Sequence, residues 1–269
     1  IEAARQSIYK EFSEVIESDG TYINEHHLTL LCDRMTYSKK MISILIDPDK
    51  ATENQIDKLI GHPDFVNVDF VFVGGSLVTD GNMGHCIHLV KQRTQKPIVI
   101  FPGSPNQIDN QADGILLLSL ISGRNSDLLI GRHVESSHKL KNSNLELLST
   151  GYILLDGGRT TTVSYISNTT PIPQDKPDIA AATALAGCQI GHKLIYLDCG
   201  SGANKHASEK LIQCVKNEIN VPLIVGGGIK TQYDAEKVFR AGADIVVVGN
   251  HLEKNPYFLS ELVAAKHNC

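Results

Sequence analysis

The sequence predicts an α/β protein, a (β/α)₈ barrel built as a single domain. The chain has 269 residues, close to the roughly 250 residues of an ordinary barrel of this type. Short β-branched apolar runs recur eight times, and helix-like stretches separate most of them. Strands that alternate with helices predict a parallel sheet, and eight such units predict that the sheet closes on itself.

The eight runs are typical of strands that are buried on both faces, because each is continuously apolar rather than alternating with polar residues. Each run ends in glycine, aspartate, proline or serine, which are turn residues. The predicted strands are Ile42–Ile46, Asp69–Val73, Ile98–Phe101, Ile115–Leu118, Tyr152–Leu155, Leu194–Leu197, Leu223–Val225 and Ile245–Val248.

Two of the stretches between the strands carry clear helix signals. The first, over residues 52–60, opens with Thr52 as an N-cap and places its isoleucines and leucine on one face. The second, over residues 231–241, opens with Thr231 and is followed by Gly242, a typical C-cap residue. Both stretches therefore predict helices that pack against the barrel.

The repeat is irregular in two places, and a further segment precedes it. Only a short segment that contains Pro102–Pro105 separates the third and fourth strands, so the helix there is predicted to be shortened or missing. Residues 156–177 form a long Thr-, Ser-, Gly- and Pro-rich segment with no evident helical pattern, and a loop of this length is usually functional or disordered. Residues 1–40 are predicted to form a helical extension packed on the outside of the barrel.

Composition excludes several classes of function. The formal net charge is -5, and no basic stripe is present, which argues against a nucleic-acid partner. No apolar run reaches the roughly 18–20 residues that a transmembrane helix needs, and no signal-peptide pattern is seen. None of the six cysteines forms a CxxC pair. We therefore expect a cytoplasmic protein, with at most transient membrane contact through an apolar groove.

Glycine-bearing turns follow the last two predicted strands, at Gly226-Gly227-Gly228 and at Gly249-Asn250. Glycine lets backbone N–H groups point at a ligand, and a helix N-terminus adds its positive end. Barrels frequently bind a phosphate group at this position. The alternative is that these glycines only form tight turns, but two such turns at the same mouth favour a phosphate site.

A third turn follows the sixth predicted strand, where Tyr196 lies within the end of the strand and Asp198 comes just after it. Gly200 and Gly202 then open a turn that suits a bound anion. A carboxylate beside a phosphate site is a candidate general base. The alternative is that Asp198 forms a turn or caps a helix, which aspartate also favours.

Acidic and hydroxyl side chains follow the first two predicted strands. Asp47 and Asp49 come after the first strand, and Ser76 comes after the second. Adjacent strands meet at the mouth of a barrel, so Ser76 is expected to face Asp47. Oxygen ligands of this kind suit Mg²⁺ when substrate phosphates and waters complete the shell. Taken alone, each segment is more typical of a turn.

The combination of these motifs, in this order, resembles the geranylgeranylglyceryl phosphate synthase family, which also includes bacterial heptaprenylglyceryl phosphate synthases. Two further segments are similar to the longer version of the family. The resemblance covers almost the whole chain after Met41. The matching segments are Leu45–Lys50, Val73–Ser76, Phe101–Ile108, Ser167–Pro173, Tyr196–Ala203, Val225–Lys230 and Val246–Asn250.

The resemblance implies transfer of a geranylgeranyl group from geranylgeranyl diphosphate to the 3-hydroxyl of sn-glycerol 1-phosphate. It places Asp47 and Ser76 on the magnesium positions, and Tyr196 and Asp198 on the catalytic positions. Asp198 stands where relatives commonly have glutamate, so it either acts as the base or only orients the acceptor. The implied glycerol-phosphate site comprises Tyr196, Leu197, Asp198, Cys199, Gly200, Ser201, Gly202, Gly227, Gly228, Gly249 and Asn250.

Three alternatives stay open. One is the same reaction on a longer donor, such as a heptaprenyl diphosphate. Another is a different phosphate-binding barrel enzyme, an isomerase or an aldolase. The third is a barrel that binds phosphometabolites without catalysis. The resemblance also implies a homo-oligomer, a dimer or a hexamer.

Overall fold

The computed structural model describes residues 10, 13, 40–79 and 82–269. The chain divides into two compact units, residues 1–40 and Met41–Cys269, and the second unit is described below. The predicted N-terminal helical extension lies outside the described residues except for Lys10, Ser13 and Lys40. Among the described residues, no helix combines the length and the apolar composition that crossing a bilayer demands.

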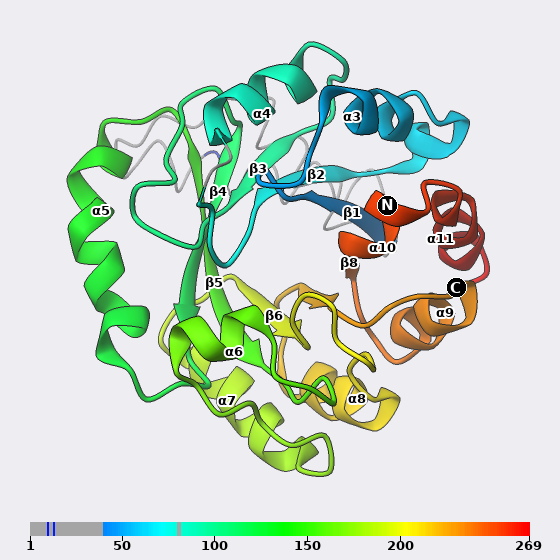
Figure 1. Cartoon of the computed structure of the whole chain (residues 1–269). Helices are drawn as coiled ribbons and strands as arrows, with labels where there is room; N and C mark the ends of the chain where they lie inside the picture. Colours follow the sequence, from blue (N-terminus) through cyan, green and yellow to red (C-terminus); the bar gives the residue numbers. More distant parts are fainter. Residues whose placement is uncertain (1–9, 11–12, 14–39, 80–81) are drawn as a thin grey trace. The chain divides into compact units, whose positions relative to one another are not determined.

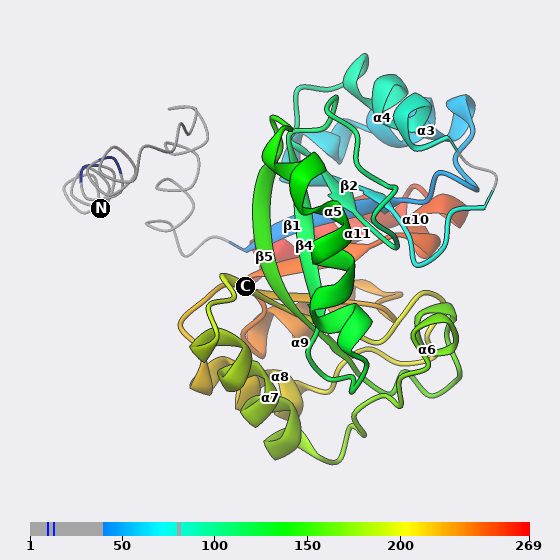
Figure 2. The same ribbon diagram turned by 90° about the vertical axis from the view of Figure 1, so that its left-hand side faces the viewer.

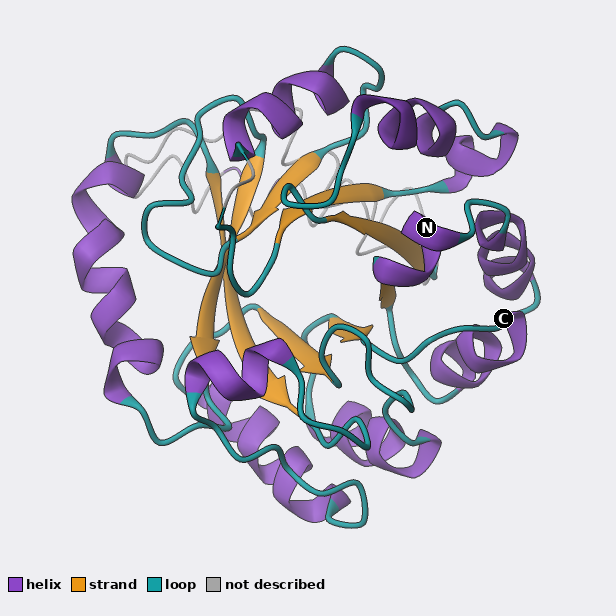
Figure 3. Cartoon of the chain, viewed as in Figure 1, coloured by secondary structure: helices purple, strands orange, loops and turns teal. Residues whose placement is uncertain are grey.

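Eight parallel strands form a closed barrel in the order of the sequence, and the last strand pairs with the first (Figures 1 and 3). This confirms the predicted fold class. The strands are β1 (Met41–Ile46), β2 (Phe70–Gly74), β3 (Ile98–Phe101), β4 (Gly114–Leu120), β5 (Glu146–Leu154), β6 (Leu194–Asp198), β7 (Leu223–Gly226) and β8 (Ile245–Val248).

All eight predicted strands are present, and β3 and β8 have the predicted bounds. The largest error is at β5, which begins at Glu146 rather than at Tyr152. The residues before Tyr152 read ELLSTG, so polar residues and a glycine interrupt the continuous apolar pattern by which the strand was recognised, and the first four are exposed or half-buried. They are held in the sheet by pairing with β4, where Glu146 lies opposite Gly114.

Helices surround the barrel (Figures 1 and 3). They are α3 (Glu53–Ile60), α4 (Met83–Lys91), α5 (Arg132–Lys141), α6 (Thr162–Ser167), α7 (Pro177–Gln189), α8 (Glu209–Glu218), α9 (Gln232–Arg240), α10 (Asn250–Lys254) and α11 (Phe258–His267), with a 3₁₀ turn η1 (Pro63–Asn67) and a π turn η2 (Asp127–Gly131).

The two helices with clear sequence signals begin and end as their cap residues predict. Thr52 caps α3 in a reciprocal capping box with Gln55, and Thr231 caps α9 in the same way. After α9, the N–H of Ala243 donates to the carbonyl of Val238, and the N–H of Gly242 donates to that of Phe239. Gly242 has a φ of 120°, so it supplies the left-handed residue that ends the helix.

The prediction for the segment after β3 is confirmed, whereas the prediction for the segment after β5 is wrong in part. Residues 102–113 contain no helix, which confirms the prediction that the helix between β3 and β4 is missing. Residues 156–177 were expected to be irregular, but they include the six-residue helix α6. Its β-branched and polar residues have modest helix propensity and hid it. It is defined instead by a capping box at Thr161 and by Asn168 in the left-handed conformation.

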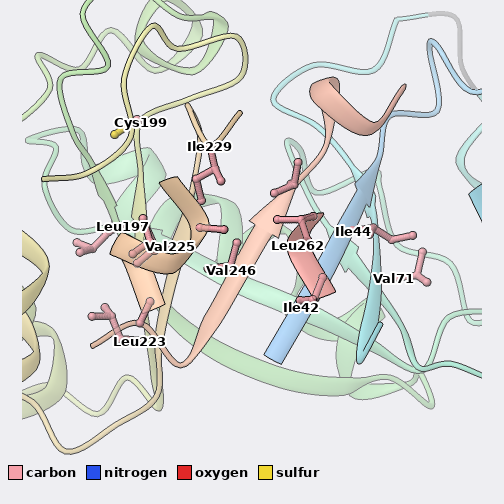
Figure 4. Packing of buried hydrophobic residues seen from close by; sticks show 14 of the residues in the cluster. Ile42, Ile44, Val71, Leu197, Cys199, Leu223, Val225, Ile229, Val246 and Leu262 are labelled. Atoms are coloured by element: carbon pink, nitrogen blue, oxygen red, sulfur yellow. The ribbon is translucent and has the colours of Figure 1, made fainter. Parts of the chain in front are cut away.

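Apolar residues form two layers, one inside the barrel and one between the strands and the helices. Figure 4 shows part of the outer layer, including Ile42 and Ile44 of β1 and Val225 of β7. Successive residues of a strand point to opposite faces, so each strand supplies both layers. This alternation decides which side chains at the strand ends reach the interior of the barrel.

Candidate active site

A cavity of about 620 Å³ lies at the C-terminal ends of the strands. It is bordered by the turns after β1, β2, β6, β7 and β8, and the short helices α6 and α10 lie on this side of the barrel (Figure 2). The predicted site residues that line it are Asp47, Ser76, Tyr196, Asp198, Gly200, Ser201, Gly202, Gly227, Gly228, Gly249 and Asn250.

Two residues predicted to bind substrate do not line the cavity. The side chains of Leu197 and Cys199 are fully buried in the layer between the strands and the helices. They alternate with Tyr196 and Asp198 along the same strand end, so they face the opposite way. The side-chain amide of Gln174 contacts the Cys199 sulfur at 3.5 Å. Their side chains therefore do not face the cavity, and their assignment to the glycerol-phosphate site stays a prediction.

The glycine turns require glycine for steric reasons. Gly227 and Gly228 have φ values of 81° and 77°, which other residues rarely adopt. A Cβ at Gly228 would lie 2.3 Å from the carbonyl oxygen of Lys205. The turns are also joined across the mouth, because the side-chain amide of Asn250 donates to the Ser201 hydroxyl at 2.6 Å. Glycine backbone and polar side chains thus border one end of the cavity.

Asp198 lies at the floor of the cavity and is only 8% exposed. Its Oδ1 accepts the N–H of Gly200 at 2.7 Å, and its Oδ2 accepts the hydroxyl of Tyr152. Burial raises the pKa of the Asp198 carboxyl, and the two hydrogen bonds oppose that rise. Sequence reasoning missed Tyr152, which it treated only as the start of a strand.

Tyr196 lies beneath Asp198 with its ring inside the barrel, 2% exposed. Its ring packs edge-to-face against Phe101 at 5.6 Å and against Tyr152 at 5.4 Å. Burial, followed by the negative charge of Asp198, raises the pKa of Tyr196 well above its usual value. Tyr196 therefore presents a protonated phenol and an aromatic wall to the cavity.

The predicted metal residues follow β1 and β2, and β1 pairs with β8, which ends at the turn that holds Gly249. Asp47 Oδ1 accepts the N–H of Asp49 at 3.1 Å, and Asp47 Oδ2 accepts the ammonium of Lys50 at 2.5 Å. A Cβ at Gly75 would lie 3.9 Å from Asp47 Oδ1, so the turn that precedes Ser76 faces Asp47.

These donors fit a hard cation only in part. A carboxylate and a hydroxyl on adjacent strands suit Mg²⁺, which commonly uses one or two protein carboxylates together with substrate phosphates and waters. No group of three or more His, Cys, Asp or Glu residues in the described part of the chain could hold a metal by itself. If Mg²⁺ binds here, Asp47 and Ser76 would supply an open half-shell, which a substrate would have to complete.

Four further residues of the cavity carried no recognisable sequence signal. Arg159 and Thr162 come from the long segment after β5, and Glu253 and Lys254 come from α10. Burial raises the pKa of Glu253. These positions follow no motif, so only the closure of the barrel identifies them.

The model of the PcrB family matches residues 35–266. A second family model, RNA polymerase Rpb1 domain 5, matches residues 1–57, which is far less than half of the chain. A geranylgeranylglyceryl phosphate synthase of Chitinophaga pinensis is 49% identical over 238 residues, 87% of this chain and 93% of that protein. One of Spirosoma linguale is 48% identical over 235 residues, 87% of this chain and 94% of that protein.

Among solved structures, the (S)-3-O-geranylgeranylglyceryl phosphate synthase of Thermoplasma acidophilum, in complex with its substrate sn-glycerol-1-phosphate, is similar with a TM-score of 0.82. It is 30% identical, and the match covers 89% of this chain and 98% of that one. A thiamine phosphate pyrophosphorylase of Pyrococcus furiosus, 12% identical with a TM-score of 0.54, shares the fold alone.

Proposed function

The chain belongs to the PcrB family, and on that premise we propose that it transfers a geranylgeranyl group from geranylgeranyl diphosphate to the 3-hydroxyl of sn-glycerol 1-phosphate. The products are geranylgeranylglyceryl phosphate and diphosphate. One observation carries this proposal: a single cavity has glycine turns at one end, an oxygen half-shell at the other and a buried carboxylate at its floor. The names of the relatives and the acceptor bound in the Thermoplasma enzyme support it.

The acceptor phosphate is assigned to the turns after β6, β7 and β8. Backbone N–H groups at Gly227, Gly228 and the start of α10 suit an anion. Lys230 also lines the cavity, and its ammonium lies 3.3 Å from the carbonyl of Asn204. A phosphate fixed here leaves the glycerol hydroxyl to reach toward Asp198, which holds it in attack geometry.

The donor diphosphate is assigned to the turns after β1 and β2. Asp47 and Ser76 would hold Mg²⁺ there, and when bound the ion supplies a Lewis acid for the diphosphate. Lys50, which contacts Asp47 at 2.5 Å, adds a positive charge at the same end of the cavity. The bound Mg²⁺ and the Lys50 ammonium would therefore neutralise the negative charge of the leaving diphosphate.

The reaction forms a carbon–oxygen bond between the glycerol hydroxyl and the allylic carbon, and breaks the bond from that carbon to diphosphate. Asp198 accepts the proton that the hydroxyl loses. Positive charge that develops on the allyl group would lie near the rings of Phe101 and Tyr196, which both line the cavity. Aromatic faces attract such charge.

The apolar tail of the donor is assigned to the side of the barrel where the helix between β3 and β4 is missing. A small cavity of about 70 Å³ lies there, bordered by residues 102–105 and by residues 115–118 of β4. Donors with C15, C20 and C35 chains compared under equal conditions would identify the preferred length. A higher kcat/KM for the C35 donor would favour the heptaprenyl reaction.

The decisive assay combines the protein, Mg²⁺, glycerol 1-phosphate and geranylgeranyl diphosphate, and detects the ether product by mass spectrometry. We expect product with sn-glycerol 1-phosphate and much less with the 3-phosphate enantiomer. Binding of the acceptor without product would favour a non-catalytic phosphometabolite-binding barrel. Omission of Mg²⁺, with chelator present, tests the metal dependence in the same assay.

We expect the protein to form a homo-oligomer, a dimer or a hexamer, and light scattering coupled to size-exclusion chromatography measures this directly. We also expect it to work in the cytoplasm, with at most transient contact with membrane lipid as product leaves. Localisation of a tagged chain by cell fractionation tests that expectation.

A further inference from the structure

The hydroxyl of Tyr152 has a position that the proposed reaction does not yet explain. In the pairing of β5 and β6, Tyr152 lies opposite Tyr196, and Leu154 lies opposite Asp198. Residues two apart on a strand share a face, so Tyr152, Tyr196 and Asp198 all point into the barrel. Asp198 lies one step nearer the mouth, and the Tyr152 hydroxyl donates to its Oδ2.

The Asp198 carboxylate is held from several sides. Gly200, just after β6, donates its N–H to Oδ1 at 2.7 Å, while Tyr152 on β5 donates to Oδ2. The turn after β7 packs closely as well, because a Cβ at Gly227 would lie 2.9 Å from Asp198 Oδ1. The two donors and the close turn fix the orientation of the carboxylate plane.

The ring of Tyr152 is itself fixed by aromatic packing. It meets Phe101 at 6.2 Å with an interplanar angle of 78°, and Tyr196 at 5.4 Å with an angle of 69°. Such edge-to-face arrangements are the preferred geometry of aromatic pairs. Tyr152 is only 5% exposed, so its hydroxyl has little freedom to leave Asp198 for water.

The charges around this pair keep Tyr152 a donor. Burial, followed by the negative charge of Asp198, raises the pKa of the Tyr152 phenol well above its usual value. The other titratable groups that sense Asp198 are Tyr196 and Cys199, and burial raises the pKa of both. At neutral pH these three groups therefore stay protonated and uncharged around the one carboxylate.

We propose that Tyr152 is the positioning residue of Asp198, because its hydroxyl both orients the carboxylate toward the acceptor hydroxyl and stabilises its ionised form. The inference rests on the proposed function of this site. Tyr152 acts on the reaction through Asp198 and not through substrate, since Tyr152 does not itself line the cavity.

The first test is Tyr152→Phe, which removes one oxygen and keeps the ring. We expect kcat to fall roughly 10- to 100-fold, the effect of losing a hydrogen bond to a charged group. KM for the prenyl donor should stay unchanged. The acid limb of the pH–kcat profile should move to higher pH, because the carboxylate loses a donor that stabilises its charge. Tyr233→Phe is the matched control on an exposed tyrosine of α9, and we expect wild-type kcat.

The second test asks whether Tyr152 acts through Asp198. Asp198→Asn is measured alone and combined with Tyr152→Phe, and we expect the second substitution to cost less than about twofold in the Asn background. If the fold-decreases in kcat of the two single variants multiply in the double variant, the inference is overturned. It is also overturned if Tyr152→Phe alone keeps the wild-type kcat. Absence of product from the wild-type chain in the same assay would instead overturn the proposed function.

A third variant covers the case in which Tyr152→Phe does not fold. 3-Fluorotyrosine at position 152 keeps the ring and the hydroxyl and makes the hydroxyl a stronger donor. We expect the acid limb of the pH–kcat profile to move to lower pH. An acid limb that does not move would contradict the role assigned to Tyr152.

Discussion

At the scale of single residues, the site depends on a few side chains whose surroundings are unequal. Asp47 lies at the rim beside Lys50, with its side chain 20% exposed, whereas Asp198 is buried among tyrosines. The two carboxylates therefore differ in access to water. That difference fits an electrostatic task for Asp47 at the leaving group and a proton-accepting task for Asp198.

Asp47→Asn should reduce Mg²⁺-dependent transfer by roughly 1,000-fold, since several kcal/mol of charge stabilisation at the leaving group are lost. The fold should stay intact, because Asp47 lies at the rim and outside the apolar layers. Steady-state kinetics with circular dichroism checks both statements. Asp57→Asn is the matched control, an exposed acid on α3 paired with Arg93. Wild-type turnover in Asp47→Asn would show that the metal assignment is wrong.

Asp198→Asn should stabilise the fold at neutral pH while it lowers kcat. Burial raises the pKa of Asp198 in the folded state above its value in the unfolded state. At a pH between these two pKa values, the folded state therefore binds more protons than the unfolded state. The stability contributed by the neutral form is present below the unfolded pKa and is lost as pH rises toward the folded pKa. Asparagine stays neutral and avoids that loss.

Thermal unfolding of wild type and Asp198→Asn across pH 3–8 measures this effect. We expect the two melting temperatures to differ most at the upper end of the range and to converge as Asp198 becomes protonated. A variant that is less stable than wild type at pH 7 would show that the hydrogen bonds from Tyr152 and Gly200 outweigh the cost of burying the charge.

At the scale of elements, one arrangement recurs at the N-terminal end of the barrel, opposite the cavity. An aspartate just before an even-numbered strand accepts the N–H of a residue in the preceding strand and also pairs with a lysine. It occurs three times in the described residues, as Asp69 with Ile42 and Lys266, Asp113 with Ile98 and Lys91, and Asp244 with Leu223 and Lys216. Each set joins two neighbouring strands and a helix.

The three pairs differ in burial, and their contributions to stability should differ accordingly. The side chains of Lys266 and Asp69 are 5% and 8% exposed, whereas those of Lys91 and Asp113 are 45% and 32% exposed. Lys266→Met should lower the free energy of unfolding by about 3 kcal/mol, because it leaves Asp69 as a buried charge without its cation. Lys91→Met should change it by less than about 1 kcal/mol.

Urea denaturation of both variants against wild type measures these differences. Equal destabilisation by Lys266→Met and Lys91→Met would show that burial does not decide the contribution of the pair. Activity should be retained in the folded fraction of both variants, because both lysines lie at the end of the barrel away from the cavity.

At the scale of the whole molecule, closure of the barrel assembles the site. The pairing of β8 with β1 brings the turn at Gly249 next to the turn at Asp47, about 200 positions apart in the chain. The proposed acceptor and donor ends therefore lie on one rim, above the buried Asp198 of the same cavity. Ligands that bind this rim connect the first and last thirds of the chain, so binding should stabilise the whole barrel.

Glycerol 1-phosphate alone should raise the melting temperature. At a concentration of about 100 Kd the expected stabilisation is roughly 2.7 kcal/mol, and glycerol 3-phosphate should give less at equal concentration. Differential scanning fluorimetry over a ligand series measures it, and a saturating shift gives the Kd. No shift with either enantiomer would contradict the assignment of the phosphate to the glycine turns.

The sequence by itself determined the eight strands, the missing helix after the third strand and the turns that border the cavity. These features depend on local chemistry: continuous apolar runs predict doubly buried strands, and glycine, aspartate and proline mark where each strand ends. The family resemblance rests on the same turns, which is why Asp47, Ser76 and the glycines were found together in the cavity.

Only the tertiary structure decided which side chains of those segments reach the cavity. Leu197 and Cys199 belong to the predicted turn motif but face the outer layer, and Tyr152 belongs to no motif but reaches Asp198. The physical reason is that strand register and barrel closure fix the facing of each residue, and both arise from hydrogen bonds between segments far apart in the chain. No local pattern in this sequence contains that information.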